Sequence, residues 1–402
     1  MAPYESDDST TAGEADDLRA GRRKAARYVV PVAVVGVAAA TIGLVPALAD
    51  SGDPDLPKIS AQQLIDKIAK SDVQQMSGTV KITTDLGLPD LGGLESSLTS
   101  GATKSGDGSS ADPTSKLTEL ATGTHTVRVA ADGPDRQKVS LLENAAEYSL
   151  IHNGKDVWGY DSQSNEVYHA TSSDSAAAQK KEDVPATPKD LTKDALKSVD
   201  DTTSVSVQGT AQVAGRDAYR LVIKPKQSGS TVGQITVAVD SKTGLPLKFT
   251  LTPASGGAAV IDAGFTQVSF AKPSSSTFDF SAPKGAKVTE DNQAEHQQKG
   301  RDKSGKSDED LAKGLDGMTV IGKGWNSVAT FDTGGQGMPS GAEAGGQFGG
   351  FLDSLGDKVS GKFGSGTVFK TRLINALITD DGKVYVGAVS KDALVKAADA
   401  AK

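Results

Sequence analysis

The chain has 402 residues, a formal net charge of −8 and no cysteine. The negative charge disfavours a nucleic-acid partner, and the absence of cysteine excludes disulfides, thiol chemistry and cysteine-ligated metal. The length is sufficient for two domains.

The N-terminal region carries an export or anchoring signal. Residues 1–27 are polar, acidic and, near their end, basic, which predicts a disordered cytoplasmic tail. Residues 28–49 are apolar, and about 20 such residues can span a bilayer. They end in Ala47-Leu48-Ala49, a pattern typical of signal-peptidase sites. Two alternatives follow: cleavage between Ala49 and Asp50, or a single-pass membrane anchor. Both place the remaining chain outside the cytoplasm.

Residues 58–290 are predicted to form a first domain that is mainly β. A helix begins at Ser60, where Gln63 completes a capping box. Strands follow from Val73, interrupted by an insertion at 85–123 that is first leucine-rich and then low in complexity. The leucines of the insertion predict either a lid or a loosely packed flap, and the lid candidates are Leu86, Leu88, Leu91 and Leu94.

Alternating apolar residues predict a series of hairpin-linked strands with a short helix at 190–199. Asn153-Gly154 and Ala214-Gly215 mark two of the turns. Antiparallel strands with one apolar face need a cover on that face. We therefore expect a mainly β (α+β) fold, a curved antiparallel sheet forming an open half-barrel closed by short helices.

Residues 291–316 are charged and lack apolar periodicity, which predicts a linker. Residues 317–402 are predicted to form a small C-terminal α+β domain. Its expected elements are strands at 318–331, 368–378 and 383–389, a helix at 351–359, and a final helix capped at Ser390.

Catalytic and metal-binding patterns are missing. The sequence has no His-Glu-x-x-His and no Gly-x-Ser-x-Gly, and its four histidines lack ligand spacing. Residues 317–323 match the spacing of a phosphate loop, but Gly324 stands where a serine or threonine is needed. We therefore expect a binding protein rather than an enzyme, with no cofactor and no metal.

The order of several motifs resembles a known family. They are Gly133-Pro134-Asp135-Arg136, the run 151–161 (IHNGKDVWGYD), the run 213–219 (VAGRDAY), the run 239–246 (VDSKTGLP) and the run 278–285 (FDFSAPKG). Together they resemble the LolA/LolB superfamily of lipoprotein carriers and, within it, the RseB/MucB type of envelope-stress regulators. The resemblance implies a half-barrel around an apolar cavity that holds acyl chains. RseB-like members add a small C-terminal domain and bind a membrane anti-sigma factor.

The leading hypothesis is thus an extracytoplasmic lipid- or lipoprotein-binding protein, and the alternative is a regulator that binds an anti-sigma factor. The leading hypothesis predicts an acyl lipid or lipoprotein as the partner, and the alternative predicts a membrane anti-sigma factor. Residues 28–49 are expected to contact the membrane, and no nucleic-acid partner is expected. Apolar strand residues either line the cavity or fill a core. The cavity candidates are Val80, Ile82, Val127, Val129, Tyr148, Leu150, Trp158, Tyr160, Val205, Val207, Leu221, Ile223, Val237 and Val239.

Overall fold

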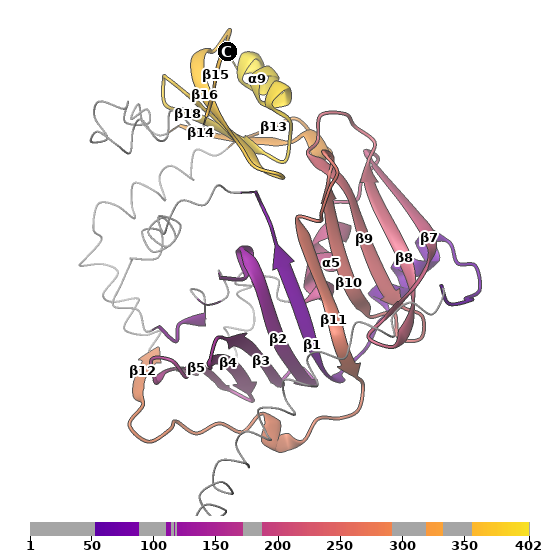
Figure 1. Ribbon diagram of the computed structural model, residues 1–402, viewed down its shortest axis with the longest axis vertical. Coiled ribbons are helices and arrows are strands. Elements are labelled where there is room, and N and C mark those ends of the chain that lie inside the picture. The colour runs from indigo at the N-terminus through magenta and orange to yellow at the C-terminus, as the bar shows by residue number, and fades with distance from the viewer. Residues whose placement is uncertain are drawn as a thin grey trace, which may run out of the picture. The chain divides into compact units, whose positions relative to one another are not determined.

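The computed structural model describes residues 53–87, 110–113, 116, 119–171, 187–291, 319–332 and 356–401. Their fold is mainly β and contains a curved sheet of twelve strands, which is not closed, and a second sheet of six strands (Figure 1). The predicted fold class and curved sheet are confirmed at this level. The predicted tail and the apolar stretch at 28–49 lie outside the described residues. Within the described residues, no helix is long and apolar enough to cross a membrane.

The large sheet consists of two antiparallel meanders and one added strand. In spatial order the strands are β12-β6-β5-β4-β3-β2-β1-β11-β10-β9-β8-β7. The ladder between β1 and β11 therefore joins the meander β1–β6 to the meander β7–β11. The first six strands are β1 (Gln75–Thr84), β2 (Gly123–Asp132), β3 (Arg136–Glu143), β4 (Ala146–Asn153), β5 (Asp156–Asp161) and β6 (Glu166–Thr171). The others are β7 (Thr203–Val213), β8 (Arg216–Pro225), β9 (Val232–Asp240), β10 (Pro246–Pro253), β11 (Ile261–Ser269) and β12 (Lys287–Asp291).

Strand β12 was not predicted from the sequence. The chain leaves β11, passes the 3₁₀ helix η4 (Ser275–Thr277) and returns to pair in parallel with β6, where Val288 lies opposite Val167. Figure 1 shows this connection running below the sheet from β11 to β12. The sheet is therefore antiparallel except at its β6–β12 edge.

Two turns show how the sequence sets the hairpins. Ala214 and Gly215 both have positive φ, at 50° and 73°, as a type I′ turn requires. The other predicted turn is shifted by one residue. Asn153 pairs with Asp156, so Gly154 and Lys155 form the turn, and of Asn153 and Gly154 only the glycine has positive φ.

Two short amphipathic helices pack on the sheet. Helix α2 (Ala61–Ala69) begins with the predicted capping box between Ser60 and Gln63. Helix α5 (Pro188–Lys197) has a second capping box, made by Thr187 and Asp190, with Pro188 in its first turn. Leu64 of α2 and Leu191 of α5 pack with the apolar side chains of β8, β9 and β10. The 3₁₀ helix η2 (Glu119–Ala121) precedes β2.

The C-terminal sheet has the order β13-β14-β18-β17-β16-β15 and is covered by helix α9 (Lys391–Ala400). Its strands are β13 (Thr319–Ile321), β14 (Val328–Asp332), β15 (Asp357–Gly361), β16 (Gly364–Lys370), β17 (Asn375–Thr379) and β18 (Lys383–Gly387), with the 3₁₀ helix η5 (Gly324–Asn326) after β13. The cap at Ser390 is confirmed. The predicted helix at 351–359 is wrong for residues 357–359, which belong to β15. The predicted single strand 368–378 is also wrong, because the loop at 371–374 divides it.

That dividing loop contacts the large sheet. Leu373 is 9% exposed and belongs to the same apolar cluster as Leu221 and Val237. The Arg372 N–H donates to the carbonyl oxygen of Leu86 at 2.8 Å. Further contacts come from Trp325, whose Nε1 donates to Thr203 Oγ1 at 2.8 Å. The small sheet thus adds side chains to the core of the large one.

Candidate functional site

One face of the large sheet is apolar across both meanders, and we call it the apolar face. Directly paired residues lie on the same side of an antiparallel sheet. The ladders pair Val207 with Leu221, Leu221 with Val237 and Val237 with Phe249. On the other side of the β1–β11 junction they pair Val80 with Val127 and Val127 with Leu141. The predicted alternation therefore builds a single apolar surface.

Twelve of the fourteen cavity candidates lie on this face, in two clusters. The first cluster holds the candidates of β7, β8 and β9, and the second holds those of β1, β2 and β4. Eight are buried, namely Val80, Ile82, Val127, Tyr148, Leu221, Ile223, Val237 and Val239. Val129, Leu150, Val205 and Val207 are half-buried.

The half-buried members of the second cluster form a row across the strands. Val129 pairs with Val139, and Val139 pairs with Leu150. Beyond Leu150 the row continues through Gly159 to Tyr168. We call Val129, Val139, Leu150 and Tyr168 the apolar row. Each of these side chains is half-buried, so the row is a place where apolar surface remains accessible on the sheet.

The neighbouring row is covered by a segment that precedes β2. Ala111 and Leu120 pack on Val80, Val127 and Tyr148, and all five are buried. The hydroxyl of Tyr148 donates to the carbonyl oxygen of Ala111 at 3.2 Å. A Cβ on Gly159 would lie 2.5 Å from the same oxygen, so the segment can approach the sheet only where that side chain is missing.

Ion pairs of Lys116, which lies between Ala111 and Leu120, also hold this segment. The Nζ of Lys116 lies 2.9 Å from Glu143 and 3.4 Å from Asp161, and the side chain is 11% exposed. Burial alone would lower the pKa of Lys116, but the hydrogen bond to Glu143 and the nearby carboxylates outweigh it and raise the pKa. Lys116 therefore stays charged and bonded.

Trp158 and Tyr160 lie on the opposite face of the sheet. Leu150 pairs with Gly159, so Trp158 and Tyr160, which flank Gly159 in β5, project to the other side. There Trp158 stacks on His169 with 3.7 Å between ring centroids, and Phe280 lies 5.4 Å from Trp158. The structure thus does not bring these two candidates together with the other twelve.

The ring nitrogens of His169 contact two carboxylates. Nδ1 lies 2.6 Å from Glu290 on β12, and Nε2 lies 3.1 Å from Asp156 on β5. Burial lowers the pKa of His169, but the hydrogen bonds and charges of the two carboxylates outweigh it and raise the pKa. This contact links the added strand β12 to β5 and β6.

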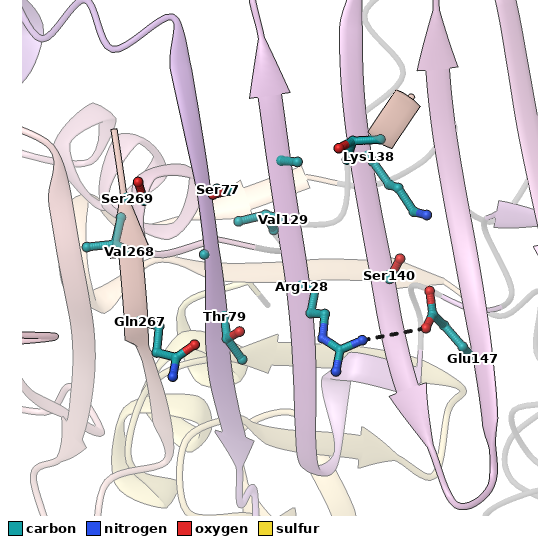
Figure 2. A pocket seen from close by; sticks show the side chains of 13 residues that line it. Ser77, Thr79, Arg128, Val129, Lys138, Ser140, Glu147, Gln267, Val268 and Ser269 are labelled. Carbon is teal, nitrogen blue, oxygen red and sulfur yellow. Dashed lines mark ion pairs between the residues drawn. The ribbon is translucent and has the colours of Figure 1, made fainter. Parts of the chain in front are cut away.

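The opposite face also carries a groove that sequence reasoning missed. It has a volume of about 440 Å³ and crosses β11, β1, β2, β3 and β4. Figure 2 shows Thr79, Arg128 and Ser140 along it, with the ion pair between Arg128 and Glu147 drawn as a dashed line. Most of its polar residues occupy alternate positions of these strands, and that alternation was the available signal.

Of the lid candidates, Leu86 packs against the first apolar cluster. Leu88, Leu91 and Leu94 lie outside the described residues. Among the residues that the structure describes, there is no group of three His, Asp or Glu side chains that could hold a metal ion.

Several solved structures resemble the chain weakly. MucB in its complex with MucA from Pseudomonas aeruginosa is 16% identical, with 84% of this chain and 96% of that chain covered and a TM-score of 0.38. An uncharacterised conserved protein from Thermus thermophilus is 14% identical, with 57% and 98% covered and a TM-score of 0.31. A LolA superfamily protein from Nitrosomonas europaea is 10% identical, with 56% and 99% covered and a TM-score of 0.22.

These structures include both protein types that the sequence motifs resemble. No curated protein matches the chain in sequence. Residues 108–290, which run from the covering segment to β12, match the family described as "Predicted periplasmic protein (DUF2092)".

Proposed function

We propose that this protein binds the acyl chains of lipids or lipoproteins outside the cytoplasm, in an open half-barrel that short helices close. The apolar row carries the proposal. Three of its four side chains, those of Val129, Val139 and Leu150, are adjacent across three strands. All four side chains of the row are half-buried, and they border a fully buried row. Contiguous accessible apolar surface on a sheet is typical of an interaction site. The periplasmic description of the matching family supports the location.

The proposal divides the candidate residues by role. Val129 and Leu150 of the apolar row contact the acyl chain, together with Val139. The buried residues, such as Val80, Val127 and Leu221, hold the sheet in shape and are core. The segment that contains Ala111 and Leu120 forms one side of the site. Leu86 lies near the start of the insertion at 85–123, which also contains the remaining lid candidates.

The driving force is burial of hydrocarbon. Each CH₂ removed from water contributes about 0.8 kcal/mol. Ordering of the chain and the lost freedom of the complex oppose this gain. A long acyl chain is therefore expected to bind better than a short one, and head-group chemistry is expected to matter less than chain length.

Uptake of a fluorescent long-chain fatty acid by the purified protein tests the proposal, together with native mass spectrometry of the protein as isolated. We expect a saturable signal that a non-fluorescent fatty acid displaces. Leu150→Glu places a charge in the apolar row and should abolish uptake. Gln208→Glu adds the same charge at an exposed position of β7 and should leave uptake unchanged. Absence of lipid and of uptake in the unchanged protein would refute the proposal.

A second candidate function is that of a regulator that binds a single-pass membrane protein such as an anti-sigma factor. Val320 on β13 favours it. This side chain is 62% exposed, and β13 is an edge strand of the small sheet. Edge strands can accept an extended segment of a partner. A pull-down from membranes should recover such a partner with the unchanged protein and lose it with Val320→Lys. If the unchanged protein and Val320→Lys recovered the same proteins, the edge strand β13 would be excluded as the binding site.

A further inference from the structure

The groove on the opposite face is built from two rows of mostly polar residues. One row runs through Gln267, Thr79, Arg128 and Ser140, which the ladders pair in succession. The second row runs through Ser269, Ser77, Ala130 and Lys138. Short side chains lie along much of both rows, and Figure 2 shows the longer side chains of Gln267, Arg128, Lys138 and Glu147 around them. A depression with a hydroxyl-rich lining results.

The groove has many side chains that can donate hydrogen bonds but only one carboxylate, that of Glu147, which can only accept them. The carboxylate of Glu147 is already engaged, because it accepts from Ser149 Oγ at 2.8 Å and lies 3.8 Å from Arg128. Ser149 in turn bonds to Ser140, with 2.8 Å between their hydroxyl oxygens. Glu147 is thus held at one side by the protein and neutralises only part of the positive charge.

The positive charge that remains faces the groove. The side chain of Arg128 is 62% exposed, and its contact to Glu147 is long for a charged hydrogen bond. None of the ion pairs among the described residues involves Lys138. Two cations and one carboxylate leave a net charge of about +1 beside hydroxyl and amide groups that can donate or accept.

We infer that this groove binds a small hydroxylated organic anion, one that carries a carboxylate or a phosphate. The anionic oxygens would accept from Arg128 and Lys138, and the hydroxyls of the ligand would bond to Ser77, Thr79 and Gln267. The volume of about 440 Å³ lies in the range of roughly 300–1,000 Å³ that small-molecule sites occupy. Val129, a member of the apolar row, also lines the groove, but the charged and hydroxyl groups that would hold the anion lie on the other side of the sheet from that row.

Titration of the purified protein with three probes tests this inference: glucuronate, glucose 6-phosphate and neutral glucose. Binding would be followed by calorimetry and by amide chemical shifts. We expect the two anionic sugars to saturate the protein with an affinity about tenfold or more above that of glucose, because one charge-assisted hydrogen bond contributes about that factor. Comparison of the carboxylate with the phosphate identifies the preferred anion.

Two variants locate the site. Arg128→Gln and Lys138→Gln should each weaken binding of the anionic sugars about tenfold. Lys224→Gln removes the same charge from an exposed position of β8 and should not change binding. Thermal unfolding of each variant shows whether it is folded. Equal affinity for glucose and the anions, no saturation by any probe, or equal losses in all three variants would overturn the inference.

Discussion

Gly159 lies directly opposite Leu150 in the β4–β5 ladder, and the carbonyl oxygen of Ala111 occupies the space that a side chain at 159 would need. Gly159→Ala would force a Cβ to within 2.5 Å of that oxygen and 2.9 Å of the Tyr148 hydroxyl. We expect a loss of about 1–3 kcal/mol in the free energy of unfolding, as for an overpacked core. Urea denaturation measures it.

The control for this variant is Gly264→Ala. Its Cβ would first meet the flexible side chain of Lys248 at 3.1 Å, and an alanine in a strand loses less conformational entropy than a glycine. Gly264→Ala should therefore be neutral or slightly stabilising. If the two variants were equally stable, the close approach of residue 111 to the sheet would be disproved.

Leu373 and Ile374 are neighbours in one loop with different surroundings. Leu373 is 9% exposed within the core of the large sheet, whereas Ile374 is 43% exposed. Leu373→Ala is expected to cost about 2–4 kcal/mol of unfolding free energy because it opens a cavity. Ile374→Ala should cost less than about 1 kcal/mol. Denaturant melts compare them, and similar costs would mean that the small sheet does not contribute to that core.

Asp240 is a buried carboxylate of the large sheet that several groups hold in place. Its side chain is 1% exposed and pairs with Arg216, and its Oδ1 accepts from the N–H groups of Lys242 and Thr243 at 3.0 and 2.6 Å. Burial raises its pKa, but the hydrogen bonds from Arg216 and Thr243 outweigh this and lower it. Asp240→Ala leaves Arg216 without its partner, and a loss of about 3 kcal/mol is expected.

The sign of the accompanying pH dependence follows from the lowered pKa. The stabilisation from Asp240 is present above the unfolded pKa of about 3.9 and is lost as the pH falls through the folded value. The difference in unfolding free energy between the unchanged protein and Asp240→Asn should therefore shrink in acid. Denaturation at pH 7 and at about pH 3 tests this, and a constant difference would contradict it.

His169 should behave in the opposite way. Its raised pKa means that the stabilisation is fully present below the unfolded pKa of about 6.5 and is lost as the pH rises through the folded value. His169→Gln should therefore cost more stability at pH 5.5 than at pH 9. Removal of one carboxylate by Glu290→Gln should reduce this pH dependence. A pH-independent effect of His169→Gln would show that the ring nitrogens do not meet charged partners.

The strands and the apolar face could be predicted from alternation alone, because Val205, Val207, Leu221 and Ile223 read as one side of two paired strands. The face of the sheet on which Trp158 lies could also have been predicted from the sequence. When a hairpin has a two-residue turn, each even-numbered residue of the first strand pairs with an odd-numbered residue of the second, and the reverse. Trp158 must then share a face with Ile151 rather than with Leu150.

Other features have no local signal. The pairing of Val288 with Val167 joins segments that are far apart in sequence. Nothing in the sequence of residues 287–291 indicates that they pair with β6. The groove depends on which polar positions of five strands align, which is set by the registers of four ladders together. The division of 368–378 into two strands depends on the Thr371 hydroxyl, which accepts from the Ile374 N–H at 2.8 Å.

The junction between β1 and β11 has a consequence for biogenesis. Val80 pairs with Val127 and with Phe265, and these partners emerge from the ribosome at very different times. A nascent or translocating chain must therefore keep one edge of β1 unpaired until the second meander has been made. An unpaired edge of that kind invites intermolecular pairing. A chaperone that covers β1 during this interval would increase the yield of folded protein without changing the stability of the folded state.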